Sequence, residues 1–312
     1  MTPGQPCTNE GFENNNFSAW TGSWGVTGAC DDWDWLGFCI HYAGQNDPYY
    51  TNGLNTGANN TTTAMHTIVT PGADGTVPIN RVRPGGGGFA MRLNDKDLSD
   101  YSAARLIQTF RVTPANENFT YFFAVVLENG GHTLPEQPYF RIRMYDQNGA
   151  TINCASFDVD ATSAGSIGGF ATQGLYSYRD WSAVFVPLQA YVNQDVTIEF
   201  IVTDCTQGGH LGYAYIDADC QPFQLLSQSP LICAGVNNTL TAPAGAASYT
   251  WTATGGGNIV SGANSQVVTV NQGGTYAVTM TAFGSGCSYT IDTIMGSNPS
   301  VPVANFSIVK EQ

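Results

Sequence analysis

The stretch that decides the fold reads Arg105-Leu-Ile-Gln-Thr-Phe-Arg-Val112, followed by Phe119-Thr-Tyr-Phe-Phe-Ala-Val-Val-Leu127. Both runs are short and rich in β-branched and aromatic residues, a composition typical of strands. Four further segments of this kind occupy residues 139–145, 182–188, 195–203 and 211–217. No segment carries a sustained 3.6-residue period, so helices between the strands are not expected. Successive strands without intervening helices predict a β-sandwich or jelly roll.

The segments between these strands carry turn and loop signals. Asp146-Gln-Asn-Gly149 predicts a tight hairpin turn, because Asn-Gly accepts the positive φ angles that such a turn needs. Residues 41–90 include the polar run Thr51–Thr63 and the glycine run Pro84–Gly88. We expect long surface loops across residues 41–90.

The strand pattern starts again after Gln221-Pro222, with predicted strands at residues 239–242, 248–253, 266–270 and 275–281. The order Cys233, Trp251, Cys287 matches the immunoglobulin-type arrangement, in which a tryptophan packs on a disulfide between facing sheets. The sequence thus predicts an all-β chain. A jelly-roll sandwich would span residues 1–222 and an Ig/PKD-like sandwich residues 223–300. Residues 301–312 would form a tail or the start of a following module.

Charge is scarce and uneven along the 312 residues. Charged residues make up 11% of the chain, and the net charge is −14, of which −13 falls on residues 1–222. An acidic, lysine-poor surface repels nucleic-acid phosphates and anionic lipid headgroups, so neither is an expected partner. No apolar run approaches the ~18 residues of a membrane span, so we expect no direct membrane insertion.

The eight cysteines form no CxxC or CxxH pair, so disulfides in an oxidising, extracellular setting are favoured over zinc; buried thiols are the alternative. Their positions suggest a local Cys30–Cys39 bond and a Cys233–Cys287 bond within the second module. A Cys7–Cys220 bond would join the ends of the first module. Cys154 and Cys205 would form the remaining pair.

Several motifs carry a family resemblance. Asn9-Glu-Gly-Phe-Glu13 and Tyr215-Ile-Asp217 resemble the first and last strands of galactose-binding-like and carbohydrate-binding jelly rolls. Further runs resemble modules of giant surface adhesins of Bacteroidota: the SprB-like gliding adhesins and related filamentous adhesins exported by type IX secretion. These runs are Thr21–Gly28, Asn46–Asn55, Pro84–Asn94, Glu136–Arg141 and Gly208–Asp217. The resemblance implies a jelly-roll head followed by Ig- or PKD-like repeats.

The same resemblance implies a structural Ca²⁺ ion between the first and last strands. Glu13 and Asp217 would supply carboxylates and the loop near Asn94 carbonyl oxygens, the hard ligands that Ca²⁺ takes. The alternative is that both acids simply cap strands. The loops Asp95-Lys-Asp97-Leu-Ser-Asp100 and Asp31-Asp-Trp-Asp34 are further acidic candidates. The Asp95 loop lacks the glycine and glutamate positions of an EF-hand, so only an irregular calcium loop is possible there.

Exposed aromatic rings beside polar groups suit sugar recognition, because the rings stack on C–H faces while polar groups bind hydroxyls. The candidates are Trp33, Trp35, Tyr49 and Tyr50, whereas Trp20 and Trp24 are expected in the core. Arg92 and Arg105 are rare cations that could bind a ligand carboxylate, although structural ion pairs are the stronger expectation.

Catalysis is not expected. HExxH, GxSxG and P-loop motifs are absent from the sequence, and His132 and His210 fit structural hydrogen bonding better than catalysis. A glycosidase-like carboxylate pair is an open alternative. The sequence favours a cell-surface adhesin fragment that contacts a polysaccharide or cell-surface glycan. Alternatives are the carbohydrate-binding module of an extracellular glycoside hydrolase, and a purely structural filament module that assembles with further copies.

Overall fold

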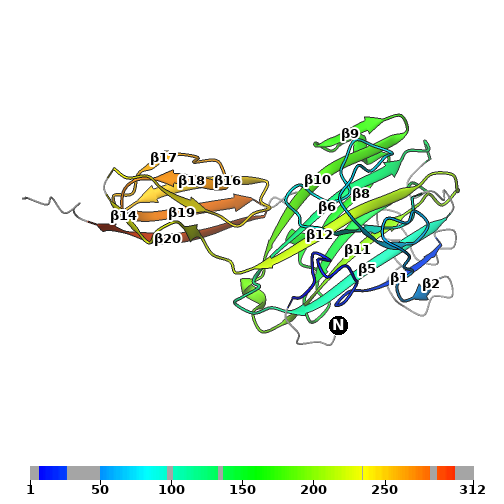
Figure 1. The fold of residues 1–312 in the computed structure, drawn as a ribbon, viewed down its shortest axis with the longest axis horizontal. Coiled ribbons are helices and arrows are strands. Elements are labelled where there is room, and N and C mark those ends of the chain that lie inside the picture. Colours follow the sequence, from blue (N-terminus) through cyan, green and yellow to red (C-terminus); the bar gives the residue numbers. More distant parts are fainter. Residues whose placement is uncertain are drawn as a thin grey trace, which may run out of the picture. The chain divides into compact units, whose positions relative to one another are not determined.

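The computed structural model describes residues 7–26, 50–96, 101–132, 136–233, 235–281 and 287–298. The chain is all-β, as the sequence predicted. It divides into two compact units, one of residues 1–223 with 283–286 and the other of residues 224–282 with 287–312 (Figure 1). Among the described residues, no helix is long and apolar enough to cross a membrane.

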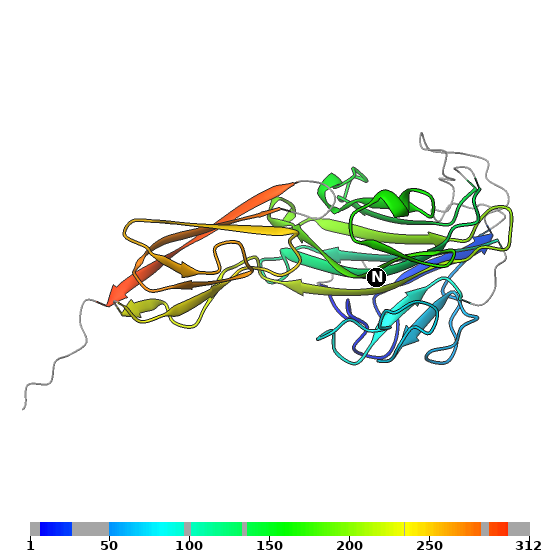
Figure 2. The ribbon, with the colours of Figure 1, turned by 90° about the horizontal axis from the view of Figure 1, so that it is seen from above.

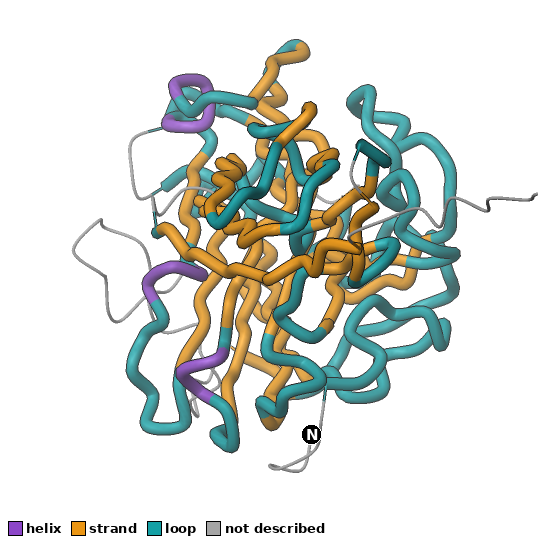
Figure 3. Tube along the Cα trace, turned by 90° about the vertical axis from the view of Figure 1, so that its left-hand side faces the viewer, coloured by secondary structure: helices purple, strands orange, loops and turns teal. Residues whose placement is uncertain are grey.

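Unit 1 is a sandwich of two six-stranded antiparallel sheets. Sheet I has the order β2 (Tyr50–Asn52), β1 (Thr21–Val26), β5 (Ser102–Arg111), β11 (Asp195–Thr203), β7 (Tyr139–Tyr145), β8 (Phe157–Asp160). Sheet II has the order β3 (His66–Val69), β4 (Ala90–Leu93), β12 (Gly212–Gln221), β6 (Asn118–Glu128), β10 (Tyr176–Pro187), β9 (Phe170–Gln173). Three short 3₁₀ turns lie in connections between strands (Figure 3): Asn153–Ala155, Ser163–Ser166 and Gln189–Tyr191.

The core lies between the two sheets and follows the period-2 alternation of the strands. In β5, Leu106 and Phe110 are buried while Arg105, Thr109 and Arg111 face outward. Aromatic rings dominate the facing layers, including Phe110, Phe119, Tyr121, Phe123, Phe140 and Phe200. The hairpin turn predicted at Asp146–Gly149 is present, with Gly149 at φ +80° and Asp146 Oδ1 accepting the amides of Asn148 and Ala150.

The expectation of surface loops across residues 41–90 was wrong for much of the described part. Residues 66–69 and 90–93 are the fully buried strands β3 and β4. The connection between them buries Val77, Ile79 and Val82 in a second apolar cluster over the outer face of sheet II. Figure 2 shows this segment, in cyan, along one side of unit 1. The outer face of sheet II is therefore covered by the chain itself.

Unit 2 is a smaller sandwich of two four-stranded sheets. One has the order β13 (Leu226–Ser227), β15 (Asn238–Thr241), β18 (Val267–Val270), β17 (Ile259–Ser261). The other has the order β14 (Leu231–Cys233), β20 (Ser288–Asn298), β19 (Gly274–Thr281), β16 (Ser248–Thr254). Trp251 is buried in the core, as expected, and its indole Nε1 donates to the Ser265 carbonyl oxygen at 2.8 Å.

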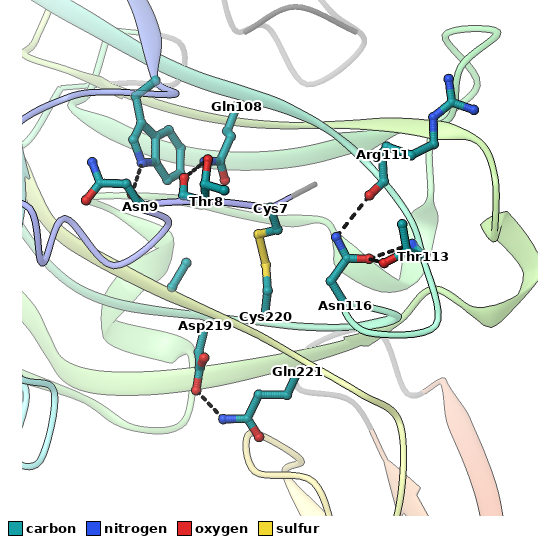
Figure 4. The surroundings of a disulfide bond; sticks show 12 residues. Cys7, Thr8, Asn9, Gln108, Arg111, Thr113, Asn116, Asp219, Cys220 and Gln221 are labelled. Atoms are coloured by element: carbon teal, nitrogen blue, oxygen red, sulfur yellow. Dashed lines mark hydrogen bonds between the residues drawn. A yellow bond between two sulfur atoms is a disulfide. The ribbon is translucent and has the colours of Figure 1, made fainter. Parts of the chain in front are cut away.

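The predicted Cys7–Cys220 disulfide is present and joins the segment before β1 to the end of β12 (Figure 4). The two Cα atoms are 6.4 Å apart, within the ordinary range for a disulfide. Close by, Gln108 Nε2 donates to the Thr8 carbonyl oxygen at 3.2 Å, which ties the same N-terminal segment to β5. Cys30 and Cys39 lie outside the described residues.

The Cys233–Cys287 and Cys154–Cys205 pairings were wrong. Cys205 and Cys233 are thiols, whereas Cys154 and Cys287 are disulfide-bonded. In unit 2, Cys233 pairs with Asn298 at one end of β20, while Cys287 precedes the other end. An eleven-residue strand spans roughly 35 Å, far beyond the ~7 Å limit between bonded cysteine Cα atoms.

The same reasoning separates Cys154 from Cys205. The Ile152 amide donates to the Met144 carbonyl, and Met144 pairs with Ile198 in β11. Cys205 lies seven residues further along the chain from Ile198, past the opposite end of the strand, which amounts to about 20 Å.

Candidate functional site

The outer face of sheet I carries a row of mostly polar side chains, interrupted by Ile201, that strand register places side by side. Ser23 pairs with Asn52 on β2 and with Arg105 on β5. Arg105 pairs with Ile201 on β11, and Ile201 with Arg141 on β7. Residues directly opposite one another on neighbouring strands share a face. One continuous row therefore crosses five strands of the sheet.

A groove of about 580 Å³ opens at the β2–β1–β5 end of this row. Its apolar wall consists of Trp20, Leu54 and Ile107, and its polar groups include Ser23, Asn52 and Arg105; Thr21, Gly22 and Gly53 complete the lining. The volume falls within the roughly 300–1,000 Å³ of small-molecule sites. A mostly apolar surface with few polar groups is the usual composition of such sites.

Ser23 stands out among the groove residues. It is 2% exposed, and its Oγ has no hydrogen-bond partner among the described residues. A buried hydroxyl without a partner costs about 1–3 kcal/mol of folding free energy. Such a group in a groove wall is available to a ligand.

Arg105, by contrast, is held by protein partners. Its Nε forms an ion pair with Glu199 Oε1, and Glu199 Oε2 accepts a hydrogen bond from the Tyr145 hydroxyl at 3.1 Å. Burial, together with the Glu199 charge, raises the pKa of Tyr145 to about 12, so the hydroxyl remains a donor. The expectation of a structural ion pair at Arg105 was therefore right. Arg92 is buried, and its guanidinium donates to the carbonyl oxygens of Asn94 and Ala64.

Three of the four predicted aromatic site residues fall in a part of the chain that the structure does not describe. Trp33, Trp35 and Tyr49 lie outside the described residues, and Tyr50 opens β2, where its backbone pairs with Gly25. Trp20 packs in the core against Phe12, with ring centroids 5.0 Å apart. Trp24 is partly buried against the same core, as expected.

A second, acidic cleft of about 420 Å³ brings Glu13 and Asp217 together. Asp217 Oδ2 accepts from Arg83 Nε at 2.5 Å, while the Glu13 carboxylate accepts from the backbone amides of Gly88 and Phe89. Glu10 and Asp219 also line the cleft. Four carboxylates thus line a cleft that contains one guanidinium, and Asp217 alone of them is shown bonded to it.

Electrostatics in this cleft disfavour further negative charge. Burial raises the pKa of Asp217 to about 7; the Arg83 guanidinium opposes this rise and the Glu13 carboxylate adds to it. Burial likewise raises the pKa of Glu10, and the nearby Asp219 adds to the effect. The cleft holds four carboxylate groups and one cationic side chain. Such an oxygen-rich donor set is of the kind that hard cations such as Ca²⁺ bind.

Of the other predicted calcium ligands, the structure describes Asn94 and Asp95. The Asn94 amide donates to Asp204 Oδ1 and to the Gly212 carbonyl, and its backbone carbonyl accepts from Arg92. The side chain and carbonyl of Asn94 thus belong to a buried network with Arg92, Asp204 and Gly212. Asp95 is fully buried. Asp97 and Asp100, like Asp31, Asp32 and Asp34, lie outside the described residues.

Sequence reasoning missed Ser23, Asn52 and Ile107 as groove residues. The only available signal was the alternation of Thr21 and Ser23 with Trp20 and Trp24, which assigns the two polar residues to the outer face. Asn52 and Ile107 reach the groove only through strand pairing with β1.

The comparisons with known proteins give one family match and several similar solved structures. Residues 221–295 match the PKD-like domain family. None of the curated proteins matches the chain. One similar solved structure is the carbohydrate-binding module TmCBM61 in complex with β-1,4-galactotriose, with 14% identity and a TM-score of 0.35, covering 70% of this chain and 99% of that module.

Two other solved structures are similar at lower scores. A carbohydrate-binding module specific for non-crystalline cellulose, CBM28, is 13% identical with a TM-score of 0.29, covering 70% of this chain and 96% of that one. The adhesin domain of Epf from Streptococcus pyogenes is 9% identical with a TM-score of 0.21, covering 68% and 78% of the two chains. The residues that match the PKD-like domain family, 221–295, make up most of unit 2.

Proposed function

We propose that unit 1 is a glycan-binding module whose ligand occupies the groove between β1, β2 and β5. The observation that carries this proposal is the buried hydroxyl of Ser23, which has no hydrogen-bond partner among the described residues, in the wall of a partly apolar groove. A sugar hydroxyl would supply the missing hydrogen bond. Asn52 and Thr21 are exposed beside it and offer further donors and acceptors.

The mixed chemistry of the groove suits a carbohydrate better than other ligand classes. Leu54 and Ile107 offer apolar contact to the C–H faces of a sugar ring, while hydroxyl and amide groups serve its hydroxyls. The one cation of the described lining, Arg105, is already paired with Glu199, which disfavours a phosphate or carboxylate ligand.

Binding without hydrolysis fits this groove. Glycoside hydrolysis uses two carboxyl groups that flank the scissile bond, about 5–9.5 Å apart. The described residues that line the groove include no aspartate or glutamate. The groove therefore lacks the acid and the nucleophile or base of that mechanism among its described lining.

A glycan array followed by calorimetric titration of the best ligand tests the proposal. We expect Asn52→Ala to weaken binding by about 3- to 10-fold, as the loss of one neutral hydrogen bond would. Asn148→Ala is the matched control, because Asn148 is an exposed asparagine at a hairpin tip on another part of unit 1. Absence of any glycan ligand, or equal effects of both substitutions, would refute the site.

For the acidic cleft we propose a Ca²⁺ ion held by Glu13 and Asp217. A bound cation would supply positive charge to a cleft in which four carboxylates face one guanidinium. We expect Ca²⁺ to raise the melting temperature and EDTA to reverse the rise, and Asp217→Asn to abolish the response. An unchanged melting temperature with Ca²⁺ would argue that Arg83 alone balances the cleft.

At the level of the whole protein we propose a cell-surface adhesin of the gliding or filamentous kind, with the PKD-like unit as a spacer. Disulfide formation supports an extracellular location, since such bonds persist in oxidising compartments. The full-length gene product discriminates this role from a hydrolase accessory module. Tandem PKD-like repeats with a sorting domain would support the adhesin, whereas an attached hydrolase domain would contradict it.

A further inference from the structure

Two connections between the central strands of the sheets meet at one end of unit 1. The β6–β7 connection leads from sheet II to sheet I, and the β11–β12 connection leads back. Because β7 pairs with β11 and β6 with β12, both connections lie at the same end (Figure 1). His132 belongs to the first connection, and Cys205 and His210 belong to the second. The fold thus gathers three residues from two distant segments.

The ligand atoms of these three side chains converge. His132 Nε2 lies 3.1 Å from His210 Nδ1, and Cys205 Sγ lies 3.6 Å from the same nitrogen. All three ligand atoms lie within 4.8 Å of one another. With Zn–N near 2.05 Å and Zn–S near 2.3 Å, a tetrahedral site separates two nitrogens by about 3.3 Å and a sulfur from a nitrogen by about 3.6 Å. The His132–His210 and Cys205–His210 separations are close to these two edges.

The backbone around the cluster is shaped to hold the three side chains together. A Cβ atom at Gly130 would collide with the His210 ring and lie 2.8 Å from the His132 ring, so only glycine leaves room for both imidazoles. Gly208 and Gly209 have φ angles of +74° and +91°, which let the short connection turn back on itself. The Cys205 amide donates to the His210 carbonyl at 3.0 Å and closes this turn.

Hydrogen bonds also fix the two connections to each other. The Thr206 amide donates to the Glu136 carbonyl at 2.9 Å, and Gln207 Nε2 donates to Glu136 Oε1 at 2.7 Å. The Leu211 amide donates to Glu128 Oε2 at 3.2 Å. These hydrogen bonds hold the two connections in place around the cluster. Little reorganisation would therefore be required when an ion binds.

We propose that His132, Cys205 and His210 form a zinc site. A thiolate with two imidazoles is a donor set that Zn²⁺ takes, with a fourth position for water or an exogenous ligand. It is distinct from the acidic cleft, whose oxygen donors suit a hard cation instead. The ion would cross-link the β6–β7 connection to the β11–β12 connection.

Titration of the full chain, with its disulfides intact, with ZnCl₂ tests the proposal. We expect one equivalent to bind, and the melting temperature of unit 1 to rise by roughly 5–10 °C when free zinc reaches about a hundredfold excess over Kd. Co²⁺ in place of zinc should give the near-ultraviolet charge-transfer band of a cobalt–thiolate bond. Zinc should also protect Cys205 from alkylation.

The variants separate this site from adventitious binding. Cys205→Ser and His132→Gln should each weaken zinc binding by at least about 100-fold, and Cys205→Ser should abolish the cobalt–thiolate band. Cys233→Ser is the matched control, because Cys233 is a thiol of unit 2, and should leave both signals unchanged. Circular dichroism confirms that each variant is folded. No stoichiometric zinc binding, or binding that survives both substitutions, would overturn the site.

Discussion

The effect of the Ser23 hydroxyl on folding stability can be measured separately from its effect on glycan binding. Ser23→Ala removes a buried polar atom that has no partner among the described residues. We expect the free energy of unfolding to stay equal or rise by up to about 1 kcal/mol, because an unsatisfied hydroxyl is lost. Glycan affinity should fall by about 3- to 10-fold.

Urea unfolding and calorimetric titration measure these two effects on the same protein. The opposite result, a loss of stability above about 1 kcal/mol with unchanged affinity, would identify Ser23 as a structural residue. Thr109→Ala, on the outer face of sheet I like Ser23, is a useful comparison, since the Thr109 hydroxyl is hydrogen-bonded to that of Thr197 at 2.8 Å. That substitution should lower stability slightly and leave affinity unchanged.

His66 makes the stability of unit 1 depend on pH. Its Nδ1 accepts the Asn55 amide at 3.1 Å, so the ring proton resides on Nε2 and is donated to the Arg105 carbonyl at 2.9 Å. Burial lowers the pKa of this neutral histidine to about 4. The unfolded chain, with an ordinary pKa near 6.5, takes up a proton between pH 6.5 and 4 that the folded protein does not. The contribution of neutral His66 to the free energy of unfolding is therefore complete above pH 6.5. It falls by about 3 kcal/mol as the pH drops from 6.5 to 4.

Comparison of the wild type with His66→Gln isolates this contribution from that of the carboxyl groups. Glutamine offers an acceptor oxygen and a donor NH₂ group but does not titrate. At pH 7 the variant should be less stable than the wild type, and the difference should shrink by about 3 kcal/mol at pH 4, as measured by urea unfolding. A difference that stays constant with pH would show that His66 does not contribute this proton linkage.

At the scale of elements, Asp74 anchors the connection between β3 and β4. Its carboxylate accepts the amides of Thr76 and Val77, the hydroxyls of Tyr213 and Tyr215, and Lys96 Nζ at 2.7 Å. Asp74→Ala would leave a partly buried ammonium group and two buried hydroxyls without this acceptor. We expect a loss of about 3–5 kcal/mol in the free energy of unfolding.

Hydrogen exchange should locate this loss in the segment between β3 and β4, whose amides would exchange faster than those of sheet I. Asp146→Ala is the matched control, because Asp146 also accepts two backbone amides but is exposed at a hairpin turn. Its loss should lower the free energy of unfolding much less than the loss of Asp74, because its surroundings are solvated. Equal losses for the two substitutions would contradict the anchoring role of Asp74.

The long strands could be predicted from sequence because their composition and alternation are unambiguous. The predicted spans 139–145 and 195–203 coincide with β7 and β11, and 119–127 falls one residue inside each end of β6. The strands β3 and β4 were missed because each has four residues, all buried, and therefore shows no alternation. Neighbouring loop-forming residues outweighed so short a signal.

At the scale of the whole molecule, the groove residues could not be predicted, because the periodicity of a sequence does not show which strands pair or in which register. Asn52, Ser23 and Arg105 lie far apart in sequence and meet only through the register of β2, β1 and β5. The pairing of Cys7 with Cys220 could be predicted, because the two ends of a closed domain meet. The partners of Cys154 and Cys287 could not, since their expected partners lie at opposite ends of long strands.

The Cys7–Cys220 bond closes a loop of 213 residues, nearly the whole of unit 1, and its removal should affect that unit alone. A cross-link across so long a loop restricts the unfolded chain strongly, and the chain-entropy estimate reaches about 5 kcal/mol. The double variant Cys7→Ser/Cys220→Ser should therefore unfold at a temperature roughly 10 °C lower in the unit 1 transition. The unit 2 transition should not move in differential scanning calorimetry. Cys233→Ser, which removes a thiol outside any disulfide, should move neither transition, and an equal shift of both transitions in the double variant would contradict the independence of the two units.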